Sequence, residues 1–124
     1  MGSLLHEIVI DCRDPGELAR WWARVLDWQV VDREAGYSWI SRNGELGDDL
    51  LLVFVPVSEP KTVKNRIHLD ISPTGVDQQQ ESERLLALGA THADIGQGDV
   101  DWIVLADPEG NEFCLLNSRI EPPA

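Results

Sequence analysis

The sequence predicts an α+β fold built from two tandem βαβββ modules. Each half of the chain has the pattern of a strand, a helix and three further strands, in the same order. Short motifs also recur, with IVIDC echoed by IHLDI and SWIS echoed by DWIV. Asp11 and Asp70 hold the same place in the two copies, as do Trp39 and Trp102. Such regular recurrence is the pattern of an internal duplication.

The first module is expected over about residues 4–57. The stretch LLHEIVIDC alternates and is rich in β-branched residues, which predicts a strand. A helix follows in RDPGELARWWARVLDW, with Asp14 as its N-cap and Pro15 in the first turn. Its apolar face at helical spacing comprises Leu18, Trp21, Trp22, Val25 and Leu26. WQVVDR, YSWISR and DLLLVFVPV are the next three predicted strands, and SEPKTVKN is a connector.

The second module is expected over about residues 65–118. RIHLDIS predicts its first strand, and TGVDQQQESERLLALG predicts a helix that begins at Thr74 as N-cap and ends at Gly89. Leu85, Leu86 and Leu88 form the buried side of this helix. Strands are predicted in ATHADI, DWIVLAD and NEFCLL, and the last two flank a tight DPEGN turn.

Composition limits the classes of function. The 124 residues make one domain, with 43% apolar and 26% charged residues, and no apolar run approaches the about 20 residues of a membrane span. The start of the chain has no basic leader or cleavage site, so a cytoplasmic protein with Cys12 and Cys114 as buried thiols is expected. A net charge of -12 argues against nucleic acid or an anionic membrane as partner, whereas it permits a cationic ligand or only aids solubility.

Strand alternation predicts which face carries the ligand site. It places Glu7, Val9 and Asp11 on one face, and likewise groups His68 with Asp70 and Glu112 with Cys114. A polar side chain buried without a partner costs about 1–3 kcal/mol, so a face with several of them is better explained by a wet ligand site than by a core. The opposite face, expected to pack against the helices, comprises Ile8, Ile10, Ile67, Leu69, Phe113 and Leu115.

Three motifs together resemble the vicinal oxygen chelate superfamily, which includes glyoxalase I, extradiol dioxygenases and bleomycin-resistance proteins. The motifs are DCRDPGELARWWARVLDW, KNRIHLDI and LADPEGNEFCLL, and the last two are similar to those of its glyoxalase-like branch. The resemblance covers nearly the whole chain. It implies that the modules form a curled mixed sheet around a cleft, completed in a homodimer. It also implies that a divalent metal, where one is present, is held by four side chains from equivalent strands.

The metal positions implied by the resemblance are altered in this chain. His68 falls at a metal histidine, Cys114 at a glutamate ligand and Glu7 at the first-strand histidine, while Val53 lies near a second glutamate. Valine cannot bind a metal, and a thiol suits poorly the oxygen-loving metals of this superfamily. We therefore expect no cofactor and take Cys114 as a small buried wall of the cleft. A metal ion, if one is present, would be held by Glu7, His68 and Cys114.

A small-molecule site with His68 as candidate catalytic residue is the resulting expectation, since a histidine beside carboxylates suits acid–base chemistry. Its expected ligand-binding residues are Glu7, Val9, Asp11, Trp39, Val53, His68, Asp70, Trp102 and Cys114. Three functions fit this set. The first is a small-molecule-binding protein, as a lyase- or isomerase-type enzyme without a standard metal site or as a non-enzyme. The second is a resistance protein that sequesters a basic drug at a dimer cleft, and the third is a metal-dependent lyase or dioxygenase.

Overall fold

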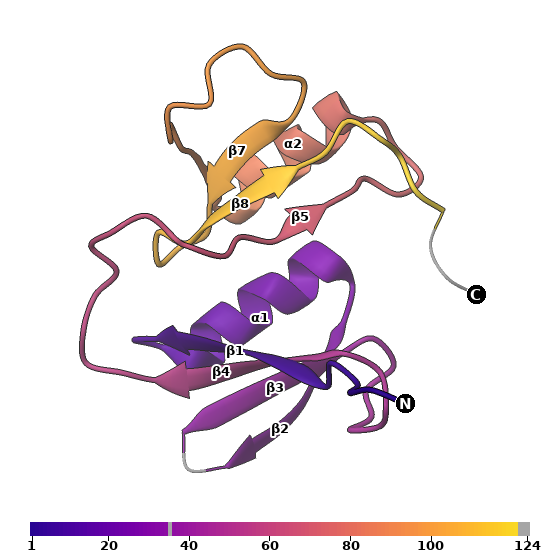
Figure 1. The fold of residues 1–124 in the computed structure, drawn as a ribbon, viewed down its shortest axis with the longest axis vertical. Helices are drawn as coiled ribbons and strands as arrows, with labels where there is room; N and C mark the ends of the chain where they lie inside the picture. Colours follow the sequence, from indigo (N-terminus) through magenta and orange to yellow (C-terminus); the bar gives the residue numbers. More distant parts are fainter. Residues whose placement is uncertain (35, 122–124) are drawn as a thin grey trace. The chain divides into compact units, whose positions relative to one another are not determined.

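The computed structural model describes residues 1–34 and 36–121 and divides into two compact units, Met1–Pro60 and Lys61–Ala124 (Figure 1). The first unit contains β1 (Glu7–Cys12), α1 (Pro15–Leu26), β2 (Gln29–Glu34), β3 (Tyr37–Ser41) and β4 (Leu51–Pro56). The second contains β5 (Asp70–Ile71), α2 (Gln78–Leu88), β6 (Thr91–His92), β7 (Ile103–Ala106) and β8 (Glu112–Leu115). The predicted α+β fold of two βαβββ modules is confirmed.

The two units share one topology. The strand order is β1-β4-β3-β2 in the first sheet and β5-β8-β7-β6 in the second. In each sheet the first strand of the module pairs in parallel with the last, and the other pairs are antiparallel. Each module therefore has its own four-stranded mixed sheet, with its first strand at one edge.

The two ends of helix α1 are set by its capping residues. The side chain of Asp14 accepts a hydrogen bond from the Glu17 N–H at 3.2 Å, and Pro15 occupies the first turn, where its missing N–H costs nothing. The helix ends at Asp27, whose φ of 56° lies in the left-handed region. Trp22 on its apolar face is buried, as are Ile40 and Phe54 in the strands of the same unit.

Helix α2 begins three residues later than its sequence predicts. Asp77, rather than Thr74, is the N-cap: its carboxylate accepts from the Gln80 N–H at 2.8 Å, while the Gln80 side chain accepts from the Asp77 N–H at 3.3 Å. This reciprocal capping box satisfies two N–H groups at once, which Thr74 cannot match. Gly89 ends the helix with a φ of 116°, as predicted.

The first strand of the second module is shorter than RIHLDIS predicts. Only Asp70–Ile71 form β5, and His68 lies in the irregular segment before it. Ile67 is therefore not part of the core, contrary to expectation, and is 83% exposed. The core of this unit includes Leu105 paired with Phe113, together with Leu85 of α2, which lies along one face of the sheet (Figure 1).

Two further expectations are that both cysteines are buried thiols and that the chain has no membrane-spanning segment. Cys12 and Cys114 are both buried and are not joined in a disulfide. Over the described ranges, neither helix has the length and apolar character needed to cross a bilayer.

The cap assignment gives a direct test by paired substitutions. Asp77→Ala should lower the free energy of unfolding by about 1 kcal/mol, because it removes the acceptor for the Gln80 N–H. Thr74→Ala, at an exposed position before the helix, should change it far less. Urea unfolding followed by circular dichroism measures both. An equal loss for the two variants would contradict the assignment.

Candidate functional site

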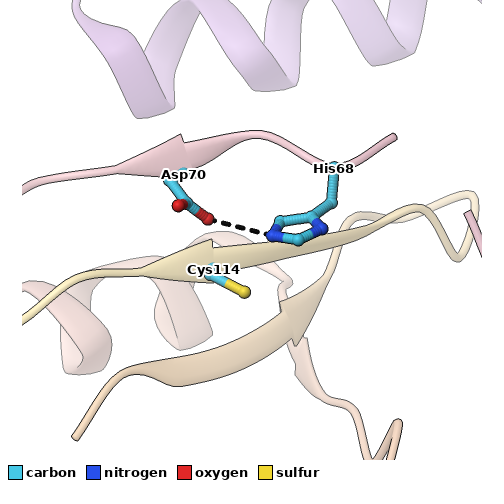
Figure 2. A group of neighbouring side chains, drawn as sticks. All are labelled: His68, Asp70 and Cys114. Carbon is cyan, nitrogen blue, oxygen red and sulfur yellow. Dashed lines mark ion pairs between the residues drawn. The ribbon is translucent and has the colours of Figure 1, made fainter. Parts of the chain in front are cut away.

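The pairing of β5 with β8 brings together three side chains that can bind ligands. Asp70 lies directly opposite Cys114 in this parallel pair, and the backbone is held by hydrogen bonds from the Cys114 N–H to the Leu69 carbonyl and from the Leu116 N–H to the Ile71 carbonyl. His68 precedes Asp70 by two residues, and Figure 2 shows its ring turned toward Asp70, with the thiol of Cys114 beside them. One ligand atom from each residue lies within 4.8 Å of the others.

His68 and Asp70 form an accessible ion pair. The Nε2 atom of His68 lies 3.1 Å from Oδ1 of Asp70, and the two side chains are 41% and 48% exposed. A carboxylate at this distance accepts a hydrogen bond from the ring N–H and so orients the imidazole. The pair can therefore accept or donate a proton, or anchor a polar ligand, at a surface that solvent reaches.

Cys114 is the buried member of the cluster. Burial raises the pKa of its thiol, and the negative charge and hydrogen-bond acceptance of Asp70 raise it further, whereas Lys64 lowers it. A thiol with a raised pKa stays protonated at neutral pH and is a weak nucleophile. Without a metal ion, Cys114 is therefore a donor to Asp70 and a wall of the site rather than a reactive group.

A second polar cluster ties the connector to β8, on the same face as Cys114. Glu112 accepts hydrogen bonds from the Lys61 ammonium at 2.6 Å and from the Asn65 N–H at 2.7 Å. The Asn65 side-chain amide donates to the Glu112 carbonyl at 3.2 Å. We call these three residues the Glu112 clasp. Burial alone raises the pKa of this carboxyl group, but the Asn65 and Lys61 donors outweigh it, so the pKa of Glu112 lies below its ordinary value.

The DPEGN turn positions Glu112 at the start of β8. The buried carboxylate of Asp107 accepts from the backbone N–H groups of Glu109 and Asn111 and from the Asn111 side chain. Gly110 has a φ of 87°, which only glycine adopts without strain. Both features agree with the turn chemistry that the sequence predicts.

The remaining expected ligand residues lie apart from this cluster in sequence, and most belong to the first unit. Val9, Val53 and Trp39 lie opposite one another across β1, β4 and β3, so they share a face. Glu7, Val9 and Asp11 are exposed, whereas Val53 is buried. The rings of Trp39 and Tyr37 are neighbours, with their centroids 6.0 Å apart. Trp102, in the second unit, is 40% exposed and lies just before β7.

The Glu112 clasp contains functional candidates that sequence analysis missed. The sequence predicts no role for the connector, and it places Glu112 only on the same face as Cys114. The one sequence signal was a pair of lysines, Lys61 and Lys64, in a chain with few basic residues. Spacing gives no indication of this contact, because Lys61 and Glu112 lie 51 positions apart.

The clasp predicts a pH-dependent effect of Glu112→Gln. In chelator-treated protein at pH 7 this substitution should lower the free energy of unfolding by about 1–3 kcal/mol, because it removes a charged acceptor. The folded pKa is lowered, so the contribution is present above the unfolded pKa, near the ordinary 4.5, and is lost as pH falls through the folded value. The difference from wild type should therefore close in acid. Glu45→Gln, at an exposed glutamate, is the control; a pH-independent difference for Glu112→Gln would contradict the clasp.

Known structures resemble this fold over nearly its whole length. A glyoxalase/bleomycin resistance protein/dioxygenase family enzyme from Burkholderia phytofirmans PsJN has a TM-score of 0.64 at 20% identity, covering 91% of this chain and 97% of that one. The fosfomycin resistance protein FosX from Mesorhizobium loti has a TM-score of 0.67 at 18% identity, covering 95% and 93%. FosX from Listeria monocytogenes, complexed with Mn(II) and sulfate ion, has a TM-score of 0.64 at 14% identity, covering 95% and 91%. No curated protein matches the sequence significantly.

A divalent metal ion is compatible with the second unit, so the expectation of no cofactor is not confirmed. His68, Asp70 and Cys114 offer a nitrogen, an oxygen and a sulfur donor, enough for a site that keeps an open position. The donor that completes the set is Asp70, which the sequence expectation of Glu7, His68 and Cys114 did not include. Val53 brings no donor, so the four-residue set of the superfamily is not reproduced.

The family follows from the sequence match. Residues 7–116 match the family described as the glyoxalase-like domain, which is most of the chain. The match includes both modules and every residue of the His68, Asp70 and Cys114 cluster. The chain therefore belongs to the glyoxalase-like domain family of the vicinal oxygen chelate superfamily, as its three motifs predict.

Proposed function

We propose that this protein binds a small organic molecule on the face of the second unit that carries His68, Asp70 and Cys114. The exposed ion pair between His68 and Asp70 is the observation that supports it, because it places a hydrogen-bond donor and an acceptor side by side on accessible surface. Cys114 gives the site a compact, weakly polar floor.

In the metal-free protein this arrangement suits proton transfer. Asp70 holds one imidazole nitrogen of His68, which leaves the ring oriented to take a proton from a bound molecule. A lyase- or isomerase-type reaction on a small oxygenated substrate fits this chemistry. The protein would act in the cytoplasm, as a single glyoxalase-like domain, where Cys12 and Cys114 remain reduced.

A second candidate is sequestration of a basic drug at a dimer cleft, as the net charge of -12 favours a cationic ligand. In the first unit, Glu7 and Asp11 are exposed on either side of Val9 on β1, on the face that also carries Trp39. Carboxylates beside an aromatic ring suit a flat cation. This candidate predicts ligands that are amines and binding that weakens with added salt.

Ligand screening separates the two candidates. A panel of small carboxylic acids, hydroxy ketones and aromatic amines is tested for a rise in melting temperature of chelator-treated protein, since a ligand at 100 times its Kd stabilises by about 2.7 kcal/mol. Compounds that bind the proposed face should lose their effect with His68→Ala and Asp70→Asn and keep it with His92→Ala, a substitution at the exposed β6. Binders that respond only to Glu7→Gln and Asp11→Asn would contradict the first candidate and support the second.

We also propose that the protein is a homodimer. Strand β1 lies at the edge of its sheet, and its Val9 side chain is 53% exposed, a combination that favours pairing with a further element. Light scattering at micromolar concentration should give about twice the 13.9 kDa chain mass. A monomer mass across this range would contradict the dimer and the shared cleft with it.

A further inference from the structure

We propose that the small molecule bound by the second unit is a carboxylate, and that Lys64 is the residue that selects it. The inference rests on the proposed function and names the class of ligand. It concerns the second unit alone, since Lys64 and the face that carries His68 both belong to Lys61–Ala124. The carboxylate would contact the Lys64 ammonium, and a hydroxyl or carbonyl group of the same molecule would contact the ion pair of His68 and Asp70.

The two carboxylates on this face already have partners within the protein. Glu112 is paired with Lys61 at 2.6 Å, and both side chains are largely buried. Asp70 lies 3.1 Å from His68 and also accepts a hydrogen bond from the thiol of Cys114. Each carboxylate is therefore bound by groups other than Lys64.

Lys64 is a cation that has no such partner. Its ammonium donates to the Asn65 carbonyl at 3.2 Å, and no carboxylate in the described part of the chain forms an ion pair with it. The carbonyl is neutral and occupies one of three N–H donors, so the charge is left unbalanced. The side chain is exposed, and a ligand can reach the other donors. With 22 acidic and 10 basic residues in the chain, a shortage of acidic groups does not explain this.

Hydrogen bonds of the neighbouring residue hold Lys64 close to the ligand face. The Asn65 N–H donates to the Glu112 carboxylate at 2.7 Å, and the Asn65 amide donates to the Glu112 carbonyl at 3.2 Å, which attaches the backbone here to the start of β8. Glu112 and Cys114 lie on the same face of that strand. Burial and Asp70 raise the pKa of the Cys114 thiol, and the charge of Lys64 opposes them, as expected for an ammonium near this face.

The balance of charge favours a ligand with a single negative charge. One ammonium matches a carboxylate, whereas a phosphate dianion beside Asp70 would leave negative charge unpaired in a chain that already has a net charge of -12. At physiological ionic strength, exposed charges more than about 8 Å away are largely screened, so the nearby ammonium outweighs the distant acidic residues. Attachment at both Lys64 and His68 would fix the orientation of the ligand, which proton transfer requires.

Paired acids and amides test the proposal on the full chain. Lactate, mandelate and 3-hydroxybutyrate are each compared with the corresponding amide, which has a similar shape without the charge. Binding to chelator-treated, isotope-labelled protein is followed by nuclear magnetic resonance. The acids should shift the backbone N–H signals of residues 64–70 and 112–116 and bind about 5–10-fold more tightly than the amides, because they gain a charge-assisted hydrogen bond. Lys64→Gln should remove this preference, and Lys64→Arg should retain it.

Arg66→Gln is the matched control, because Arg66 is exposed on the same segment and the substitution removes the same charge. It should leave the preference for acids unchanged, and circular dichroism checks that each variant is folded. An equal loss for Lys64→Gln and Arg66→Gln, or no binding of any of the acids, would overturn the proposal. Binding that is lost with His68→Ala but does not distinguish acids from amides would contradict the carboxylate alone. Acids that bind independently of His68→Ala and Asp70→Asn would contradict the proposed function as well.

Discussion

The candidate site depends on one short parallel pairing, that of β5 with β8. It sets Asp70 opposite Cys114. The alternation of side chains along β8 then decides on which face of the sheet each of its other residues lies. Phe113 and Leu115 turn into the core of the unit, while Glu112 and Cys114 turn to the other face. A slip of one residue would bury Glu112 and expose Phe113, so the same core that stabilises the unit also fixes the register of the polar face.

Because β5 is short, the Glu112 clasp is important for holding the segment that carries His68 in place. Two residues of strand give few backbone hydrogen bonds, and His68 lies outside them. The clasp attaches the chain at Lys61 and Asn65, so the segment that carries His68 is held at both ends: by Glu112 before it and by β8 after it. The segment between these attachments has little backbone freedom left to lose when a ligand or ion binds, which lowers the entropic cost of binding.

The sequence predicts the features that depend on neighbouring residues. Asp14 followed by Pro15 marks the start of α1, and the DPEGN turn gives the β7–β8 connection, because both require only local hydrogen bonds. Features that depend on distant partners are not predictable in this way. The length of β5 is set by hydrogen bonds to β8, and the Lys61–Glu112 contact joins residues with no periodic relation. The start of α2 is an intermediate case, since both Thr74 and Asp77 can cap a helix and only the contact with Gln80 decides.

Comparison of the two modules indicates where the chemistry is concentrated. The pairing of Asp11 with Val55 in the first module corresponds to that of Asp70 with Cys114 in the second, with a separation of 59 residues in both cases (70 − 11 and 114 − 55). At the same separation, Val9 corresponds to His68 and Val53 to Glu112. Three apolar side chains thus stand where the second module has an imidazole, a thiol and a carboxylate. The face of the first sheet combines these valines with Glu7, Asp11 and Trp39, whereas the second module brings His68, Asp70 and Cys114 together. The duplicated backbone therefore supports two kinds of surface, and the residues at a few equivalent positions decide which one each module presents.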